Sequence, residues 1–175
     1  MKWKNHRMLT GSVAFALTGH VIPMMLAMTG STLPNQVEGS EYDSVDWYLA
    51  HRTWSHFWPL WMTPCALSYW YLGSLSLHVD RSVPELLRLA LDYPITIGMP
   101  WALYAIFWVT AGALLHILED MPCGGVPIWK PKQRIGHRLF YVGSALEYLF
   151  AYGTAFAAVG IRYLAVGQEN FFLGL

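Results

Sequence analysis

Four apolar runs divide the chain, and polar segments separate them. The runs cover residues 9–28, 54–77, 93–118 and 139–166. Each is long enough to cross the hydrocarbon core of a membrane as a helix, which takes roughly 20 residues. The pattern predicts an all-α fold, a polytopic membrane helix bundle with three to four apolar helices. We expect residues 1–175 to form a single integral membrane domain.

The first run, residues 9–28, is open to two interpretations because His20 and Pro23 interrupt it. If it spans, the basic residues 1–8 and the basic loop 119–138 lie on opposite sides of the membrane. Positive residues should instead collect on the cytoplasmic side. The conflict disappears if the run folds back near Pro23, and the polar segments then share the cytoplasmic face.

Composition supports a membrane location and argues against nucleic acid. Hydrophobic residues make up 55% of the chain and charged residues only 13%, whereas soluble domains carry about 25% charged residues. The formal net charge is +0, so no basic footprint for nucleic acid is visible. Cys65 and Cys123 form no motif, and we expect Cys65 to be packed in an apolar run. We expect a multi-pass protein of the inner (plasma) membrane, and the sequence leaves its oligomeric state open.

Two polar stretches at the boundaries of apolar runs are candidates for a functional site. The first is His51-Arg52-Thr53-Trp54-Ser55-His56, and the second ends in His116 and Asp120. His116 and Asp120 are four apart and share a helix face. His51 and His56 would diverge by about 140° on one helix, which favours a loop–helix junction or two adjacent metals.

These residue types indicate a metal site. Zinc binds imidazole nitrogen and carboxylate oxygen, and such ions activate water for hydrolysis. Arg52 is suited to clamp an anionic oxygen, because its planar fork matches phosphate. We expect Thr53 and Ser55 to orient ligands or substrate. On spacing alone, polar caps at two helix ends remain an alternative.

The two stretches resemble a known family. Ala50-His51-Arg52-Thr53-Trp54-Ser55-His56 is similar to the HRGxTHS box of the membrane-bound, metal-dependent hydrolases named after the LexA-regulated inner-membrane protein YdjM. The segment 112–120, followed by Gly125-Val126-Pro127 and Trp129-Lys130-Pro131, is similar to that family's GxxxHxxxD box and its GVPxxWP continuation.

The resemblance implies an all-helical site related to zinc phospholipase C and P1 nuclease, with phosphoester chemistry, on lipid or a nucleotide-like molecule. It implies one or two divalent ions, zinc above all, with manganese or iron as alternatives. The family's early histidine falls on His6. The implied metal ligands are His6, His51, His56, His116 and Asp120.

The chain departs from the family at its Pro-Asp-x-Asp motif. Asn35 and Val37 stand where that motif has aspartates, and Glu38 follows one residue late. Within the HRG box, Thr53 replaces the family's Gly and Ser55 its Thr. For the general base we consider Glu119 and Glu38, with Arg52 as a further catalytic candidate.

A basic interfacial collar follows the second stretch and would bind anionic headgroups or substrate. It comprises Trp129, Lys130, Lys132, Arg134 and Arg138. Of these, Lys130, Lys132 and Arg134 are the candidates for substrate binding. The expected partners are therefore membrane lipids and a small-molecule or lipid phosphoester. Glu147, inside the last run, should face the bundle interior and pair with another group.

Three functions compete. The first is a membrane-embedded metal hydrolase with a metal-activated water as nucleophile. The second is a binding or scaffold protein with a degenerate site, which the missing aspartates favour. The third is a di-iron membrane oxygenase, because His51 and His56 also satisfy an HxxxxH box. That class needs about eight histidines and HxxHH boxes, whereas this chain has seven histidines and no HxxHH, so we rank it last.

Overall fold

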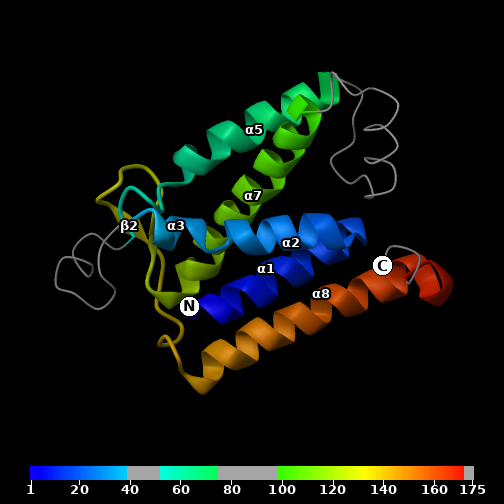
Figure 1. Cartoon of the computed structure of the whole chain (residues 1–175). Coiled ribbons are helices and arrows are strands. Elements are labelled where there is room, and N and C mark those ends of the chain that lie inside the picture. Colours follow the sequence, from blue (N-terminus) through cyan, green and yellow to red (C-terminus); the bar gives the residue numbers. More distant parts are fainter. Residues whose placement is uncertain (39–51, 75–97, 172–175) are drawn as a thin grey trace.

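The computed structural model describes residues 1–38, 52–74 and 98–171, and this part of the chain is mainly helical (Figure 1). The all-α prediction is confirmed at this level. The helices, the 3-10 turn η1 and the two short strands are, in order, α1 (Trp3–Thr18), α2 (Val21–Gly30), α3 (Leu33–Gln36), α5 (Trp58–Ser74), α7 (Gly98–Asp120), η1 (Met121–Cys123), β1 (Val126–Pro127), β2 (Arg134–Ile135) and α8 (Ala145–Phe171).

The first apolar run folds back on itself. Helix α1 ends at Gly19, whose left-handed backbone (φ 74°) donates its N–H to the carbonyl of Phe15. His20 is extended, and α2 then returns beside α1 (Figure 1). Gly19 suits this turn because it adopts positive φ without steric cost. Pro23 lies inside the first turn of α2, so the turn falls at Gly19 and His20, just before the proline.

Helices α2 and α7 cross at two glycines with almost no space between their backbones. A Cβ atom at Gly112 would overlap the carbonyl group of Ala27, and one at Gly30 would overlap the carbonyl group of Val109. Small residues allow this close approach. Gly112 and Ala113 are both buried, and Gly112 lies directly against Ala27 of α2.

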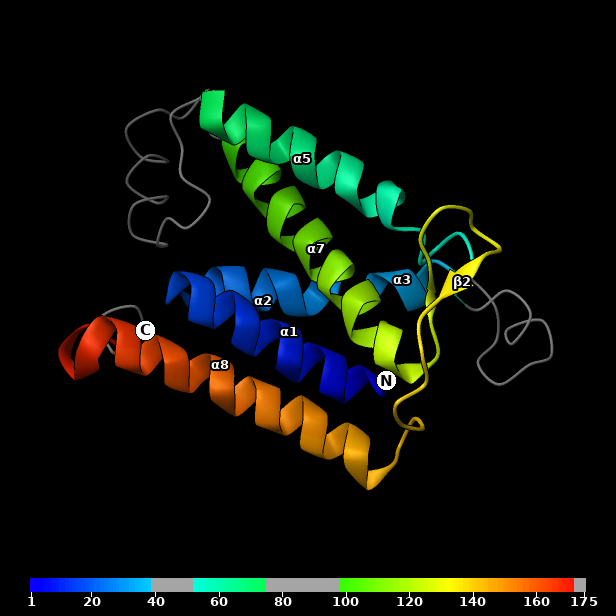
Figure 2. The same cartoon turned by 180° about the vertical axis from the view of Figure 1, so that it is seen from behind.

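The remaining long helices flank this crossing on either side. Helix α5 packs on α7, and α8 runs along α1, as the two opposite views agree (Figure 2). One apolar core contains Ala14, Ala27, Leu72, Tyr104 and Trp108. A second core contains Met1, Leu9, Cys123, Phe140 and Ala151.

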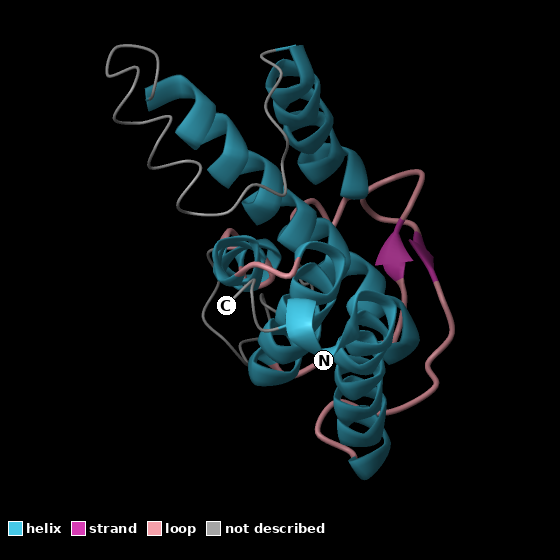
Figure 3. Ribbon diagram, turned by 90° about the vertical axis from the view of Figure 1, so that its right-hand side faces the viewer, coloured by secondary structure: helices cyan, strands magenta, loops and turns pink. Residues whose placement is uncertain are grey.

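Several segment ends meet at one end of the bundle. The start of α1, the end of α7, α3, the start of α5 and the antiparallel β1–β2 pair all lie there (Figure 1). Figure 3 shows the two short strands at the edge of the helices. Polar residues far apart in the sequence are thereby brought together.

Within the described residues, one helix is long and apolar enough to cross a membrane, at Trp101–Cys123. The other predicted spans have different limits. Helix α5 begins at Trp58, after the turn at 52–57, and is described over 17 residues. Helix α8 begins at Ala145, because Gly143 has a left-handed backbone (φ 84°) that ends the preceding turn. A polytopic arrangement therefore remains a prediction.

Buried groups behave as expected where the structure describes them. Cys65 and Cys123 are free and buried. Glu147 is fully buried and pairs with neighbours, as predicted. Its carboxylate accepts hydrogen bonds from the backbone N–H groups of Lys2 and Gly143 and from the side-chain amide of Asn5. This carboxylate fastens the start of α8 to the start of α1.

Candidate metal centre

Three helical residues form a buried group that could hold a metal ion. They are His6 from α1 and His116 and Asp120 from α7, and one ligand atom from each lies within 4.8 Å of the others. His116 and Asp120 share a helix face, as their spacing predicts, with His116 Nε2 3.5 Å from Asp120 Oδ2. The close contact of α1 with the end of α7 brings His6 to them.

His56 joins this group from the turn before α5. Its Nε2 atom lies 3.2 Å from His116 Nε2 and 3.4 Å from Asp120 Oδ2. All three imidazoles are fully buried. The loop–helix junction predicted for this histidine is confirmed, since residues 52–57 form turns and α5 starts at Trp58. His51 lies outside the described residues.

A glutamate stands behind two of the imidazoles. His6 Nδ1 lies 2.6 Å from Glu119 Oε2, and His56 Nδ1 lies 3.2 Å from Glu38 Oε1. A carboxylate accepts the Nδ1 proton, so the lone pair of each ring remains on Nε2. In both rings Nε2 is the atom that faces Asp120, at 3.3 Å for His6. Carboxylates in this position orient ligand histidines in metal proteins.

Hydroxyl groups hold the two glutamates in turn. Thr10 donates to Glu119 Oε1 at 2.8 Å, and Ser55 donates to Glu38 Oε1 at 2.6 Å. The orienting role of Ser55 was predicted from the sequence, whereas Thr10 was not among the predicted site residues. Thr10 lies four residues after His6, on the same helix face, and this spacing could have found it.

Two cations share Asp120. Arg52 Nη2 donates to Asp120 Oδ1 at 3.0 Å, and the Met1 amino group donates to the same oxygen at 2.8 Å. Arg52 has an unusual backbone (φ 58°), and its N–H donates to Glu38 Oε1 at 2.9 Å. Arg52 therefore contacts both an acid of the metal group and the glutamate behind His56.

The surroundings of His6 and His56 shift the pKa of the two imidazoles in opposite directions. Burial lowers the pKa of His6 to about 3, reinforced by the proximity of His116. His6 is thus neutral near pH 7, which is the form that binds metal. Burial also disfavours protonation of His56, but the hydrogen bonds that its ring donates to Asp120 and Glu38 outweigh burial and raise its pKa.

The donor set fits a divalent cation. His6 Nε2 and His116 Nδ1 are buried nitrogens without a hydrogen-bond partner, which is costly for polar atoms in a protein interior. The two Nε2 atoms of His56 and His116 face each other at 3.2 Å. Two ring nitrogens at that distance share either a proton or a metal ion. Imidazole nitrogens with one carboxylate are ligands that zinc accepts.

The other predicted site residues lie around this centre. Glu119 and Glu38, considered as general bases, contact imidazoles directly. Glu38 thus brings a carboxylate to the site although Asn35 and Val37 replace the family aspartates. Lys130, Lys132 and Arg134 are exposed on the β1–β2 hairpin and belong to none of these contacts with the histidines.

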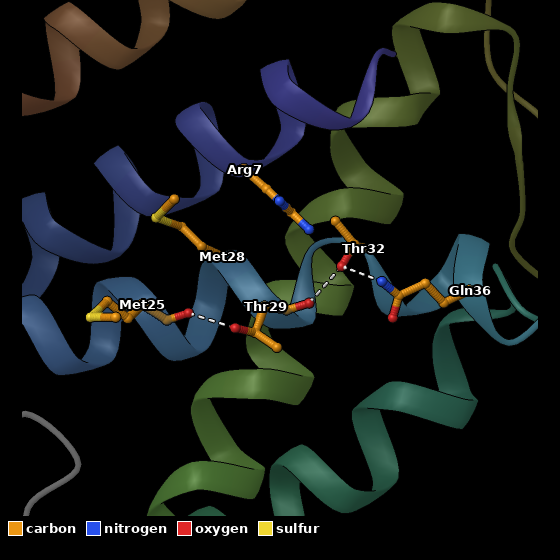
Figure 4. A pocket seen from close by; sticks show the side chains of 6 residues that line it. All are labelled: Arg7, Met25, Met28, Thr29, Thr32 and Gln36. Carbon is orange, nitrogen blue, oxygen red and sulfur yellow. Dashed lines mark hydrogen bonds between the residues drawn. The ribbon is translucent and has the colours of Figure 1, made fainter.

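Two cavities lie among the described helices and turns. One, of about 410 Å³, is lined by Val37, Glu38, Thr53, Trp54, Ser55 and Leu60. It shares Glu38 and Ser55 with the surroundings of His56. The other, of about 310 Å³, lies between α1, α2 and α3 and is lined by Arg7, Met25, Met28, Thr29, Thr32 and Gln36 (Figure 4). Its hydroxyl groups donate to backbone carbonyls, and none of its lining residues belongs to the metal group.

Comparisons of the chain with protein families, with curated proteins and with solved structures found no match. The structure itself defines a class: an all-α protein with a buried His6–His116–Asp120 group that could hold a metal ion.

Proposed function

We propose that this protein is a membrane-bound, metal-dependent hydrolase that acts on a phosphoester. One observation supports this most. The Nε2 atoms of His6, His56 and His116 all lie within 3.5 Å of the Asp120 carboxylate. Glutamates on the far side of two of these rings fix the nitrogen that faces inward. A plain structural cluster would not need that orientation.

Each residue has a role in this proposal. His6, His56, His116 and Asp120 would hold the ion, which we take to be zinc, with manganese or iron as alternatives. A bound divalent ion supplies a Lewis acid that makes water a nucleophile near neutral pH. Glu119 and Glu38 orient imidazoles, so their contacts support positioning in place of the general-base role considered from sequence.

The cavity beside His56 is the proposed path for substrate. Glu38 and Ser55 lie between this cavity and His56. Its outer wall contains Trp54, Leu60 and Val37, all more than half exposed. A polar floor with an apolar rim suits a molecule with a polar head and an apolar part. A lipid phosphoester meets this description.

Exposed apolar side chains support the membrane location. Large ones project from α5 and from α8, where most apolar side chains of a water-soluble protein would be covered. They include Leu67, Trp70, Tyr71, Leu149, Phe156, Ile161 and Leu164. With Trp101–Cys123 as a span, His116 and Asp120 lie at one membrane boundary. We place this boundary at the cytoplasmic face of the inner membrane, following the positive residues around it.

The decisive experiment is metal analysis of the detergent-purified protein, prepared without chelators and with metal added back. We compare the wild type with the double variant His116→Ala, Asp120→Ala and with His137→Ala. His137 is exposed and makes a matched control. Stoichiometric metal in the wild type and in His137→Ala, lost in the double variant, is expected. Phosphodiester and phospholipid hydrolysis by the loaded protein is then assayed.

A scaffold protein with a degenerate site is the second candidate, and one contact favours it. Arg52 and the Met1 amino group already compensate the charge of Asp120. A cluster neutralised by its own cations is stable without an ion. If the wild type and all variants contain no metal after metal has been added back, the hydrolase proposal is rejected and the scaffold protein remains.

A further inference from the structure

Arg52 has unused donor capacity next to the metal group. Its side chain is more than nine-tenths buried, and Nη2 is engaged by Asp120. Its Nε atom is buried and has no hydrogen-bond partner. A guanidinium carries five N–H donors in a rigid fork. The guanidinium group is therefore fixed by Asp120 at Nη2, while its Nε–H group can still donate a hydrogen bond.

Arg138 reaches the same place from the segment after β2. A Cβ atom built on Gly124 would lie 3.2 Å from Arg52 Nη1, 3.6 Å from Arg138 Nη2 and 3.7 Å from Arg138 Nε. Both guanidinium groups thus lie next to Gly124. In the described part of the chain, Arg138 stacks near Tyr141, its guanidinium carbon 5.2 Å from the ring centre, and pairs with no carboxylate.

Because Gly124 has no side chain, both guanidinium groups can lie this close to its backbone. The N–H groups of Gly124 and Gly125 both donate to the carbonyl of Met121, so the available donors are those of the two arginines. Two like charges this close repel unless an anion lies between them. A phosphoryl group has oxygens on several sides, so it can contact two guanidiniums while another oxygen faces the metal group. A carboxylate offers only two oxygens in one plane.

We infer that Arg52 and Arg138, which both lie next to Gly124, form a clamp for the phosphoryl group of the substrate. The inference rests on the proposed function and identifies where the phosphoester is held. Arg52 links the clamp to the metal group through Asp120. Arg138, which the sequence placed only in a basic collar, becomes a substrate-binding residue.

The test is a calorimetric titration of inorganic phosphate into detergent-purified protein, with and without stoichiometric zinc. The variants are Arg138→Gln, Arg138→Lys and Lys4→Gln. Lys4 is an exposed cation on α1 and controls for general charge. Loss of one charge-assisted contact is expected to raise the Kd for phosphate about tenfold in Arg138→Gln. The Kd of Arg138→Lys, which keeps the charge but not the planar guanidinium, should lie between those of the wild type and Arg138→Gln, and the Kd of Lys4→Gln should equal that of the wild type.

Several outcomes overturn the clamp. They are equal Kd values for wild type and Arg138→Gln, equal weakening by Lys4→Gln, absence of phosphate binding to the wild type, and equally tight binding of acetate. Zinc content is measured on the same samples. Selective loss of phosphate binding in Arg138→Gln without any bound zinc would support the clamp and reject the hydrolase. Bound zinc together with equal Kd values for phosphate in the wild type and in Arg138→Gln would support the metal site and reject the clamp.

Discussion

Glu119 and His6 are 113 positions apart in the chain, yet Glu119 Oε2 lies 2.6 Å from His6 Nδ1. Glu38 stands in the same relation to Nδ1 of His56, at 3.2 Å. The two pairs come from different elements and point their Nε2 atoms at one carboxylate, that of Asp120. This repeated arrangement distinguishes the centre from a set of helix caps.

Substituting the orienting glutamates should weaken metal binding without removing it. Glu119→Gln and Glu38→Gln keep the size of each side chain but replace the carboxyl group that faces Nδ1 of the imidazole with an amide, a weaker acceptor. We expect zinc affinity to fall about 10–100-fold, the usual effect of such outer residues. Competition with a chelating dye measures this, and His137→Gln serves as the control. Unchanged affinity in both glutamate variants would show that the rings need no such support.

The stability of the metal-free protein should depend on pH through His6. Its pKa in the folded state is about 3, against about 6.5 when unfolded. Below pH 6.5 the unfolded chain binds a proton that folded His6 does not, so stability falls as the pH drops from 6.5 toward 3. His56, whose pKa is raised, acts in the opposite direction.

Comparison with His6→Gln isolates this contribution. Near pH 7 the variant should have a lower Tm than the wild type, because it loses the bond to Glu119. The gap should narrow by pH 5, where only the wild type has to keep an imidazole neutral. Thermal unfolding of the two proteins across this range gives the answer. A gap that widens on acidification would mean that His6 is charged in the folded state.

The crossing of α2 and α7 should tolerate no added side chain. In Gly112→Ala the new methyl group meets the carbonyl of Ala27, and the helices have to separate. We expect a loss of about 2 kcal/mol, typical of overpacking. Gly153→Ala is the matched control, because Gly153 lies within α8 with nothing near its Cβ position. That change should leave stability equal or slightly higher.

Glu147 should matter for stability and not for metal. Its buried carboxylate accepts hydrogen bonds from Lys2, Asn5 and Gly143. In Glu147→Gln the amide group turns a donor toward these donors, at a cost of about 2 kcal/mol. We expect a lower Tm with unchanged zinc stoichiometry in the folded protein. Loss of zinc at full stability would place Glu147 in the metal centre instead.

The sequence predicted most of the centre because spacing and residue type carry that information. The separation of His116 and Asp120 defines a shared helix face, and the separation of His51 and His56 excludes one. The fold-back of residues 9–28 followed from charge placement, and the structure has it. The role of His6 came only through resemblance, since a lone histidine near a helix start has no pattern of its own.

Other features depend on tertiary contacts that no local pattern records. The pairing of Thr10 with Glu119 requires α1 to pack against the end of α7. Arg52 and Arg138 both lie near Gly124 only in the folded chain, and a basic segment looks the same in sequence whether or not one of its members lies near a buried arginine. The limits of α8 moved for a similar reason, because the turn at Gly143 is fixed by its bond to Glu147.

The ligands arrive from the first helix, from a central turn and from the end of α7. An ion at this centre would therefore cross-link separate segments of the bundle, and it would bind only after these segments have packed together. Binding and folding then become one equilibrium, in which each tenfold excess of free metal over its Kd adds about 1.4 kcal/mol of stability. Under metal limitation the same protein would be easier to unfold, and its abundance would follow the supply of the ion.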